Sequence, residues 1–103
     1  MKIIKCLADK IEEELDDANA YIDLAMRWKD EEHDTANLFY ELSTEEMGHV
    51  DKLHSAVVSL ITAYRNRNGD PPKDMMTLYD YLHGRHIRDA TQIRVKQGMF
   101  KAE

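Results

Sequence analysis

The scarcity of helix-breaking residues is the feature of this 103-residue chain that most restricts its fold. The chain holds 4 glycines and 2 prolines, and both prolines lie in one cluster, Asn66-Arg67-Asn68-Gly69-Asp70-Pro71-Pro72. Apolar residues at helical spacing fill the long segments on either side of this cluster, and no strand-like alternation of useful length interrupts them. The sequence therefore predicts an all-α fold.

Two polar interruptions divide the chain into three expected helices. The first helix is expected at about residues 3–29, and a polar stretch separates it from a second at about 35–66, with Asp34 or Thr35 as the N-cap. A third helix is expected at about residues 73–100, after the proline cluster. At this length we expect a single domain, residues 1–103, built as a long antiparallel helical hairpin plus a third helix.

Charge, hydropathy and cysteine content limit the classes of function. The formal net charge is −6 and the acidic excess lies before residue 73, which argues against nucleic-acid binding because phosphate contacts need clustered cations. No apolar stretch approaches the roughly 18 residues needed to span a bilayer, so we expect no membrane partner. Cys6 is the single cysteine, so no internal disulfide can form, and a cytoplasmic location is expected.

Three strongly polar residues interrupt the apolar positions of the expected hairpin. Burying a bare carboxylate is costly, so such a residue must be paired, protonated or metal-bound. In the first helix a three-then-four spacing runs through Leu7, Ile11, Glu14, Ala18, Tyr21, Ala25 and Trp28. In the second helix the same spacing runs through Phe39, Leu42, Glu46, His49, Leu53, Ala56 and Leu60.

An antiparallel hairpin brings Glu14, Glu46 and His49, here called the triad, to the same level. If the turn is centred near residue 31, positions whose numbers add up to about 62 face one another. Glu46 and His49 are three residues apart and project from one face of their helix. Two carboxylates and an imidazole suit Fe, Mn or Zn. The triad predicts either a metal site or a buried hydrogen-bonded cluster that sets the register of the bundle.

A Glu on one helix with Glu-x-x-His on its antiparallel neighbour, here Glu14 and Glu46-Met47-Gly48-His49, resembles the half-site of ferritin-like di-iron carboxylate proteins. Tyr21, seven residues after Glu14, is similar to a Tyr found at that spacing in many ferritins and rubrerythrins. The resemblance covers roughly residues 7–60. It implies that the triad binds the metal and that Tyr21 is an accessory group of the catalytic site.

The chain departs from the full ferritin-like pattern, because no second Glu-x-x-His follows residue 49. Its resemblance to short encapsulated ferritins implies that two chains complete a four-helix bundle by dimerisation, as a dimer or larger homo-oligomer. Such an assembly would hold two iron ions per dimer, with Mn or Zn as alternatives. The implied activity is that of a ferroxidase-type oxidoreductase, which oxidises Fe(II) with O2 or peroxide in the cytoplasm or inside a protein compartment.

Two alternatives stay open. The first is a metal-free helical assembly module, in which the buried Glu and His cluster sets the bundle register. The second concerns the third helix, where His83 and His86 are three residues apart and Asp89 follows three residues later. This spacing suits either a metal or the polar edge of a packed helix, so His86 and Asp89 are further candidate ligands. If either reached the triad, a single chain would close its own site.

Overall fold

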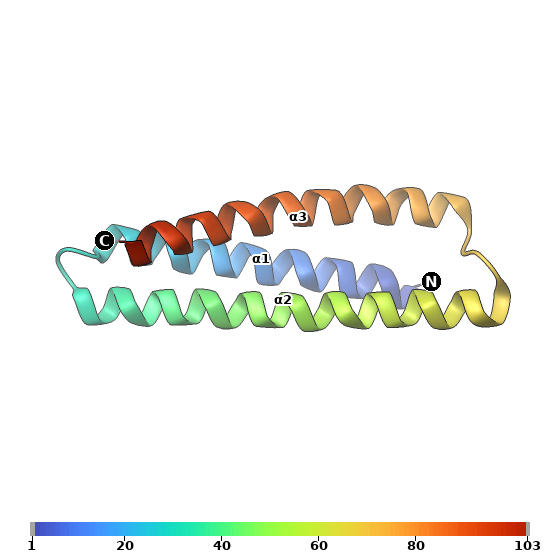
Figure 1. The fold of residues 1–103 in the computed structure, drawn as a ribbon, viewed down its shortest axis with the longest axis horizontal. Helices are drawn as coiled ribbons and strands as arrows, with labels where there is room; N and C mark the ends of the chain where they lie inside the picture. Colours follow the sequence, from blue (N-terminus) through green and yellow to red (C-terminus); the bar gives the residue numbers. More distant parts are fainter. Residues whose placement is uncertain (1, 103) are drawn as a thin grey trace.

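Three long helices make up residues 2–102, the part of the chain that the computed structural model describes; Met1 and Glu103, the ends of the expected domain, lie outside it. α1 spans Lys2–Trp28, α2 spans His33–Asn68 and α3 spans Lys73–Ala102, and no strand occurs within this range. The expected all-α class is confirmed, and each helix ends within two residues of its expected bounds. α1 and α2 form an antiparallel hairpin about 56 Å long, and α3 returns along it in the direction of α1 (Figure 1).

The turn between α1 and α2 is short, and two backbone hydrogen bonds close it. The N–H of Glu32 donates to the carbonyl oxygen of Trp28 at 2.9 Å, and the N–H of Ala36 donates to that of Glu32 at 2.8 Å. Glu32 is the N-cap of α2 and makes no side-chain capping bond. The expectation that Asp34 or Thr35 caps this helix is therefore wrong, because the helix begins early enough to include both residues in its first turn.

The proline cluster ends α2 as expected. Gly69 adopts a φ of 79°, a left-handed conformation that L side chains rarely adopt, and its N–H donates to the carbonyl oxygen of Arg65 at 3.0 Å. Pro71 and Pro72 follow, and their missing N–H groups prevent the helix from continuing. The chain reverses here and α3 begins at Lys73.

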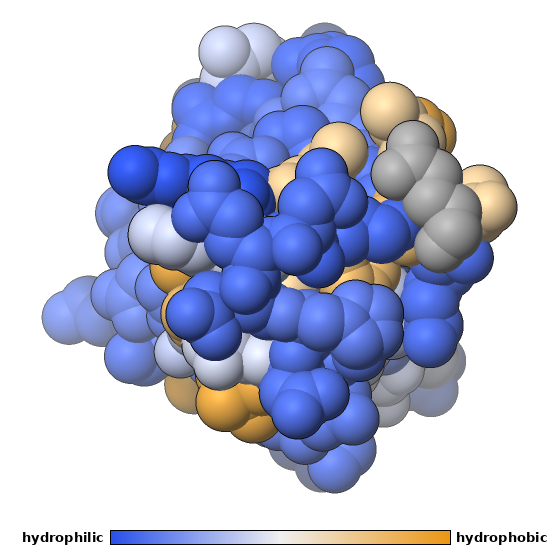
Figure 2. Space-filling model, turned by 90° about the vertical axis from the view of Figure 1, so that its left-hand side faces the viewer, coloured by the Kyte–Doolittle hydropathy of each residue, from blue (hydrophilic) through white to orange (hydrophobic). Residues whose placement is uncertain are grey.

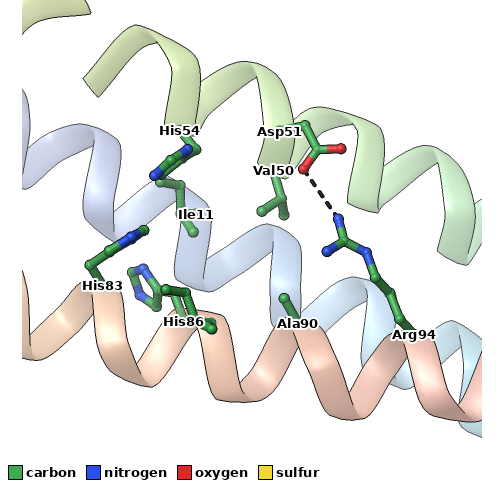
Figure 3. Close-up of a pocket in the computed structure, with 9 residues that line it drawn as sticks. Ile11, Val50, Asp51, His54, His83, His86, Ala90 and Arg94 are labelled. Atoms are coloured by element: carbon green, nitrogen blue, oxygen red, sulfur yellow. Dashed lines mark hydrogen bonds and ion pairs between the residues drawn. The ribbon is translucent and has the colours of Figure 1, made fainter. Parts of the chain in front are cut away.

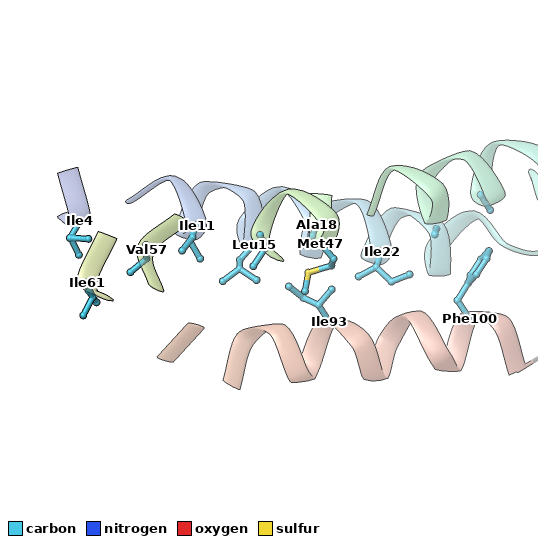
Figure 4. Close-up of a cluster of buried hydrophobic side chains, with 13 residues drawn as sticks. Ile4, Ile11, Leu15, Ala18, Ile22, Met47, Val57, Ile61, Ile93 and Phe100 are labelled. Atoms are coloured by element: carbon cyan, nitrogen blue, oxygen red, sulfur yellow. The ribbon is translucent and has the colours of Figure 1, made fainter. Parts of the chain in front are cut away.

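A continuous core of small and branched apolar side chains runs along the whole bundle (Figure 4). Ala18, Ala25 and Ala36 are fully buried, so α1 and α2 pack closely where these alanines lie. Most of the core comes from the hairpin, with a smaller share from α3. The buried apolar side chains are Ile4, Ala8, Ile11, Leu15, Ala18, Ile22 and Ala25 of α1, Ala36, Met47, Val50, Val57 and Ile61 of α2, and Ile93 and Phe100 of α3.

The apolar positions expected from the sequence are only half buried in the single chain. Ile11, Ala18 and Ala25 do belong to the core, but the other members of the two spacings are partly exposed, and His49 is exposed. They line one side of the hairpin, which we call the open face. The open face consists of Leu7, Glu14, Tyr21 and Trp28 of α1 with Phe39, Leu42, Glu46, His49, Leu53, Ala56 and Leu60 of α2.

α3 covers the side of the hairpin opposite to the open face. On α1, Glu12 forms an ion pair with Arg85 of α3, whereas Glu14 belongs to the open face. Two residues correspond to about 200° around an α-helix, so Glu12 and Glu14 point in nearly opposite directions. The amine of Lys96 in α3 reinforces this placement with a 2.9 Å contact to Asp23 of α1.

The same relationship holds on α2. Asp51 lies 3.3 Å from the guanidinium of Arg94 in α3, while His49, two residues earlier, belongs to the open face. The third helix therefore leaves the triad uncovered.

The described residues contain no helix that is long and apolar enough to cross a membrane. The end of the bundle that holds the α1–α2 turn is covered mainly by hydrophilic residues (Figure 2).

Candidate metal centre

The triad converges on one point of the open face. One ligand atom from each of Glu14, Glu46 and His49 lies within 4.8 Å of the other two. Nδ1 of His49 is 3.5 Å from Oε2 of Glu14 across the hairpin and 3.7 Å from Oε2 of Glu46 on its own helix. The register expected from the sequence is confirmed, because α1 and α2 set Glu14 level with the Glu46-to-His49 turn.

The triad is half buried and its hydrogen bonding is incomplete. The side chains of Glu14, Glu46 and His49 are 26%, 19% and 53% exposed. Oε2 of Glu46 is buried and has no hydrogen-bond partner. A buried polar atom without a partner costs about 1–3 kcal/mol, and more when it is charged. A bound cation would satisfy this oxygen, so the residues present fit a metal ion.

Chemically, the three side chains form an open and incomplete ligand set. Carboxylate oxygens and a neutral imidazole suit Fe, Mn and Zn, and three protein ligands leave room for more around each ion. The surrounding open face is apolar, and Leu7, Phe39, Leu53 and Leu60 pack only partly against the core. A second protein surface placed here would both bury these side chains and enclose the triad.

A buried polar contact fixes the hairpin register beside the triad. The hydroxyl of Ser43 donates to the backbone carbonyl oxygen of Ala18 at 2.7 Å and accepts a hydrogen bond from the amide of Gln97 at 2.9 Å. Ser43 lies one turn before Glu46 on α2, and Ala18 lies one turn after Glu14 on α1. The contact was not predicted from the sequence, in which its one signal is a serine at seven-residue spacing from Ala36 and Val50.

Tyr21 lies on the open face, two turns along α1 from Glu14. Its partly exposed ring stacks on Phe39 of α2, with 6.4 Å between the ring centroids. Within residues 2–102 no hydrogen bond joins Tyr21 to the triad. A role for Tyr21 in chemistry at the triad remains a prediction.

The structure does not bring His86 or Asp89 to the triad, because both lie on α3. His86 is buried, and its Nε2 is 3.9 Å from Oε2 of Glu12. Burial lowers the pKa of His86 below its usual value, against a smaller opposing effect of Glu12. Asp89 lines a separate cavity between α1 and α3, beside Asn19. A single chain therefore does not close the metal site in the way that the third-helix alternative required.

Comparison of the chain with models of protein families, with curated proteins and with solved structures finds no match.

Proposed function

We propose that this protein is a ferritin-like metal protein that binds Fe(II) at the triad and oxidises it with O2 or peroxide, at a di-iron site shared between two copies of the chain. The proposal rests on the convergence of Glu14, Glu46 and His49 within 4.8 Å, on the one side of the hairpin that α3 leaves open. The buried Oε2 of Glu46 supports it, since that oxygen has no hydrogen-bond partner and a cation between it and Nδ1 of His49, 3.7 Å away, would satisfy it.

The position of the triad supports a site shared between two chains. Two hairpins that pack open face against open face about a two-fold axis form a four-helix bundle, with one triad from each chain at the same level. The six side chains then surround two ions. This packing also buries the apolar members of the open face, which the single chain leaves partly exposed. α3 does not obstruct it, because α3 lies on the opposite side of each hairpin.

The residues of the triad would have distinct tasks. Glu14 and Glu46 would hold Fe(II) through their carboxylates, and a ring nitrogen of His49 would complete the protein ligands. Two Fe(II) ions give up one electron each, and with two protons these electrons reduce O2 to hydrogen peroxide or hydrogen peroxide to water. Carboxylates favour this reaction because hard, anionic oxygen ligands stabilise the more highly charged Fe(III).

A pair of substitutions tests the ligand assignment. Glu46→Ala should abolish stoichiometric Fe(II) binding under anaerobic conditions while the helix content measured by circular dichroism stays unchanged. Glu45→Ala, at the exposed neighbouring position, should bind iron like the unmodified protein. Unchanged iron content in Glu46→Ala would remove the triad from consideration as a metal site.

The apolar open face also favours the second candidate, a metal-free assembly module that uses the same face to oligomerise. In such a module Glu46 is a buried carboxylate of net cost, so Glu46→Leu should raise the free energy of unfolding. In a metal protein the same change removes a ligand, and Fe(II) or Mn(II) should no longer stabilise the fold.

A further inference from the structure

Three histidines surround one cavity on the α3 side of the bundle, away from the triad. His54 comes from α2, and His83 and His86 come from successive turns of α3 (Figure 3). The cavity has a volume of about 250 Å³ and an apolar wall formed by Ile11 and Val50. The rings of His54 and His83 are stacked, with 4.7 Å between their centroids and 9° between their planes. Two helices far apart in the sequence thus present imidazoles to the same space.

His86 has unused hydrogen-bonding capacity at this cavity. Its residue exposure is 6%, and its buried Nε2 has no hydrogen-bond partner. The nearest carboxylate, Glu12, is 3.9 Å away and already pairs with Arg85. An imidazole nitrogen buried without a partner is costly, and a bound ion or an acceptor would remove that cost.

The charged groups around the cavity largely neutralise one another. Asp51 of α2 pairs with Arg94 of α3 at the rim, as the dashed line in Figure 3 shows. With Glu12 engaged by Arg85, the three imidazoles are the remaining metal-ligating groups at the cavity. A donor set of this kind differs from the triad, which offers two carboxylates and one imidazole.

We propose that His54, His83 and His86 bind one divalent transition-metal ion that prefers nitrogen ligands, of the Zn(II), Cu(II) or Ni(II) class, in this cavity. Imidazole suits these ions better than it suits Mg(II) or Ca(II), and three imidazoles with an open fourth position form a common zinc ligand set. The lone pairs lie in the ring planes, and His83 stacks on both His54 and Tyr79, so these rings must reorient before the three imidazoles can point at one ion.

An ion at this place would fasten α3 to the hairpin. The buried residues of α3 are His86, Ile93 and Phe100, so His86 is the buried residue nearest to the start of that helix. Ligands from α2 and α3 would connect the two helices in the part of α3 before Ile93, its first buried apolar residue. Metal binding would then raise the stability of α3 docking, as any ligand that binds only the folded state does. This inference does not depend on the proposed ferroxidase function.

The test uses Zn(II) and a chain that lacks the triad. In the Glu46→Ala/His49→Ala variant, calorimetric titration near neutral pH should show about one Zn(II) per chain. Adding His54→Ala should weaken this binding by about tenfold or more, whereas adding His33→Ala, at the exposed start of α2, should not change it. No binding in the variant that lacks the triad, or equal binding with and without His54, would overturn the proposal.

Two further measurements distinguish the loss of metal ligands from a loss of folding. In the otherwise unmodified protein, His54→Ala should lower the bound Zn(II) by about one ion per chain, with helix content retained. Bound Cu(II) should show hyperfine coupling to imidazole nitrogens in its electron paramagnetic resonance spectrum, and His54→Ala should reduce the number of coupled nitrogens. A spectrum and a stoichiometry that His54→Ala leaves unchanged would contradict the assignment.

Discussion

The hydroxyl of Ser43 donates a 2.7 Å hydrogen bond to the backbone carbonyl oxygen of Ala18, in the fully buried centre of the hairpin. This bond joins α2 to α1 one turn away from both Glu46 and Glu14. Gln97 of α3 donates to the same hydroxyl, so one serine connects all three helices. The relative position of the triad residues is therefore held by a polar contact inside an otherwise apolar core.

Ser43→Ala should lower the free energy of unfolding by about 1–2 kcal/mol, because it removes one buried and one partly buried hydrogen bond and leaves the Gln97 amide without its partner. Urea unfolding followed by circular dichroism measures this change. Ser55→Ala, at an exposed position of the same helix, is the matched control and should be neutral. Equal stability of the two variants would show that the buried network does not support the fold.

If two chains pack open face against open face, Leu53→Glu should separate them while leaving the three-helix chain folded. Leu53 is a partly buried member of the open face, and a charge there would be costly to bury between two chains. Sedimentation velocity would follow the mass and circular dichroism the helix content. The matched control is Val95→Glu, which introduces the same charge at an exposed apolar residue of α3, away from the open face. Dissociation by the control alone would place the interface on α3 instead.

Added Fe(II) under anaerobic conditions, or Mn(II), should raise the melting temperature of the protein. A ligand at 100 times its dissociation constant stabilises the folded state by about 2.7 kcal/mol when it does not bind the unfolded chain. Glu14→Gln keeps the size of the side chain but removes a charged ligand, so it should abolish this shift. Asp17→Asn, at an exposed position of α1, removes the same charge and should leave the shift intact.

In the metal-free protein, held so by a chelator, stability should fall on acidification through the range near pH 6. Burial lowers the folded-state pKa of both His83 and His86 below the value of 6.5 for an unperturbed imidazole. Between these lowered pKa values and 6.5, the unfolded chain therefore binds more protons than the folded chain. The stability that depends on neutral imidazoles at these two positions is fully present above about pH 6.5. It is lost as the pH falls through the lowered pKa values.

Urea unfolding at neutral pH and at about pH 5.5 measures this loss of stability. His86→Gln should make the free energy of unfolding less dependent on pH, whereas His33→Gln, at an exposed position, should not. A pH dependence that His86→Gln leaves unaltered would mean that another group is responsible.

The helices and the register of the hairpin could be predicted from the sequence because they depend on local signals. Long amphipathic runs, two polar interruptions and a single proline cluster fix three helices. The short turn between the first two helices then fixes which residues face one another, and the triad follows from that register.

The side of the hairpin that α3 covers could not be predicted, because α1 and α2 each carry two apolar edges. Ile11 and Ala18 belong to both edges, while Leu15 points toward α3 and Tyr21 toward the open face. Polar contacts between distant residues distinguish the two sides, among them the pair between Glu12 and Arg85.

The cavity lined by histidines could not be predicted for the same reason. His83 and His86 form a recognisable pair in the sequence, but the contribution of His54 depends on where α3 docks.

The native mass of the protein together with its iron content, after anaerobic loading with Fe(II) and purification without an affinity metal column, tests the central claim most directly. A site shared between two open faces predicts a dimer or larger assembly with about one iron per chain, and a loss of that iron in Glu46→Ala. A well-folded oligomer that binds no iron would contradict the shared di-iron site and leave the triad with a structural role.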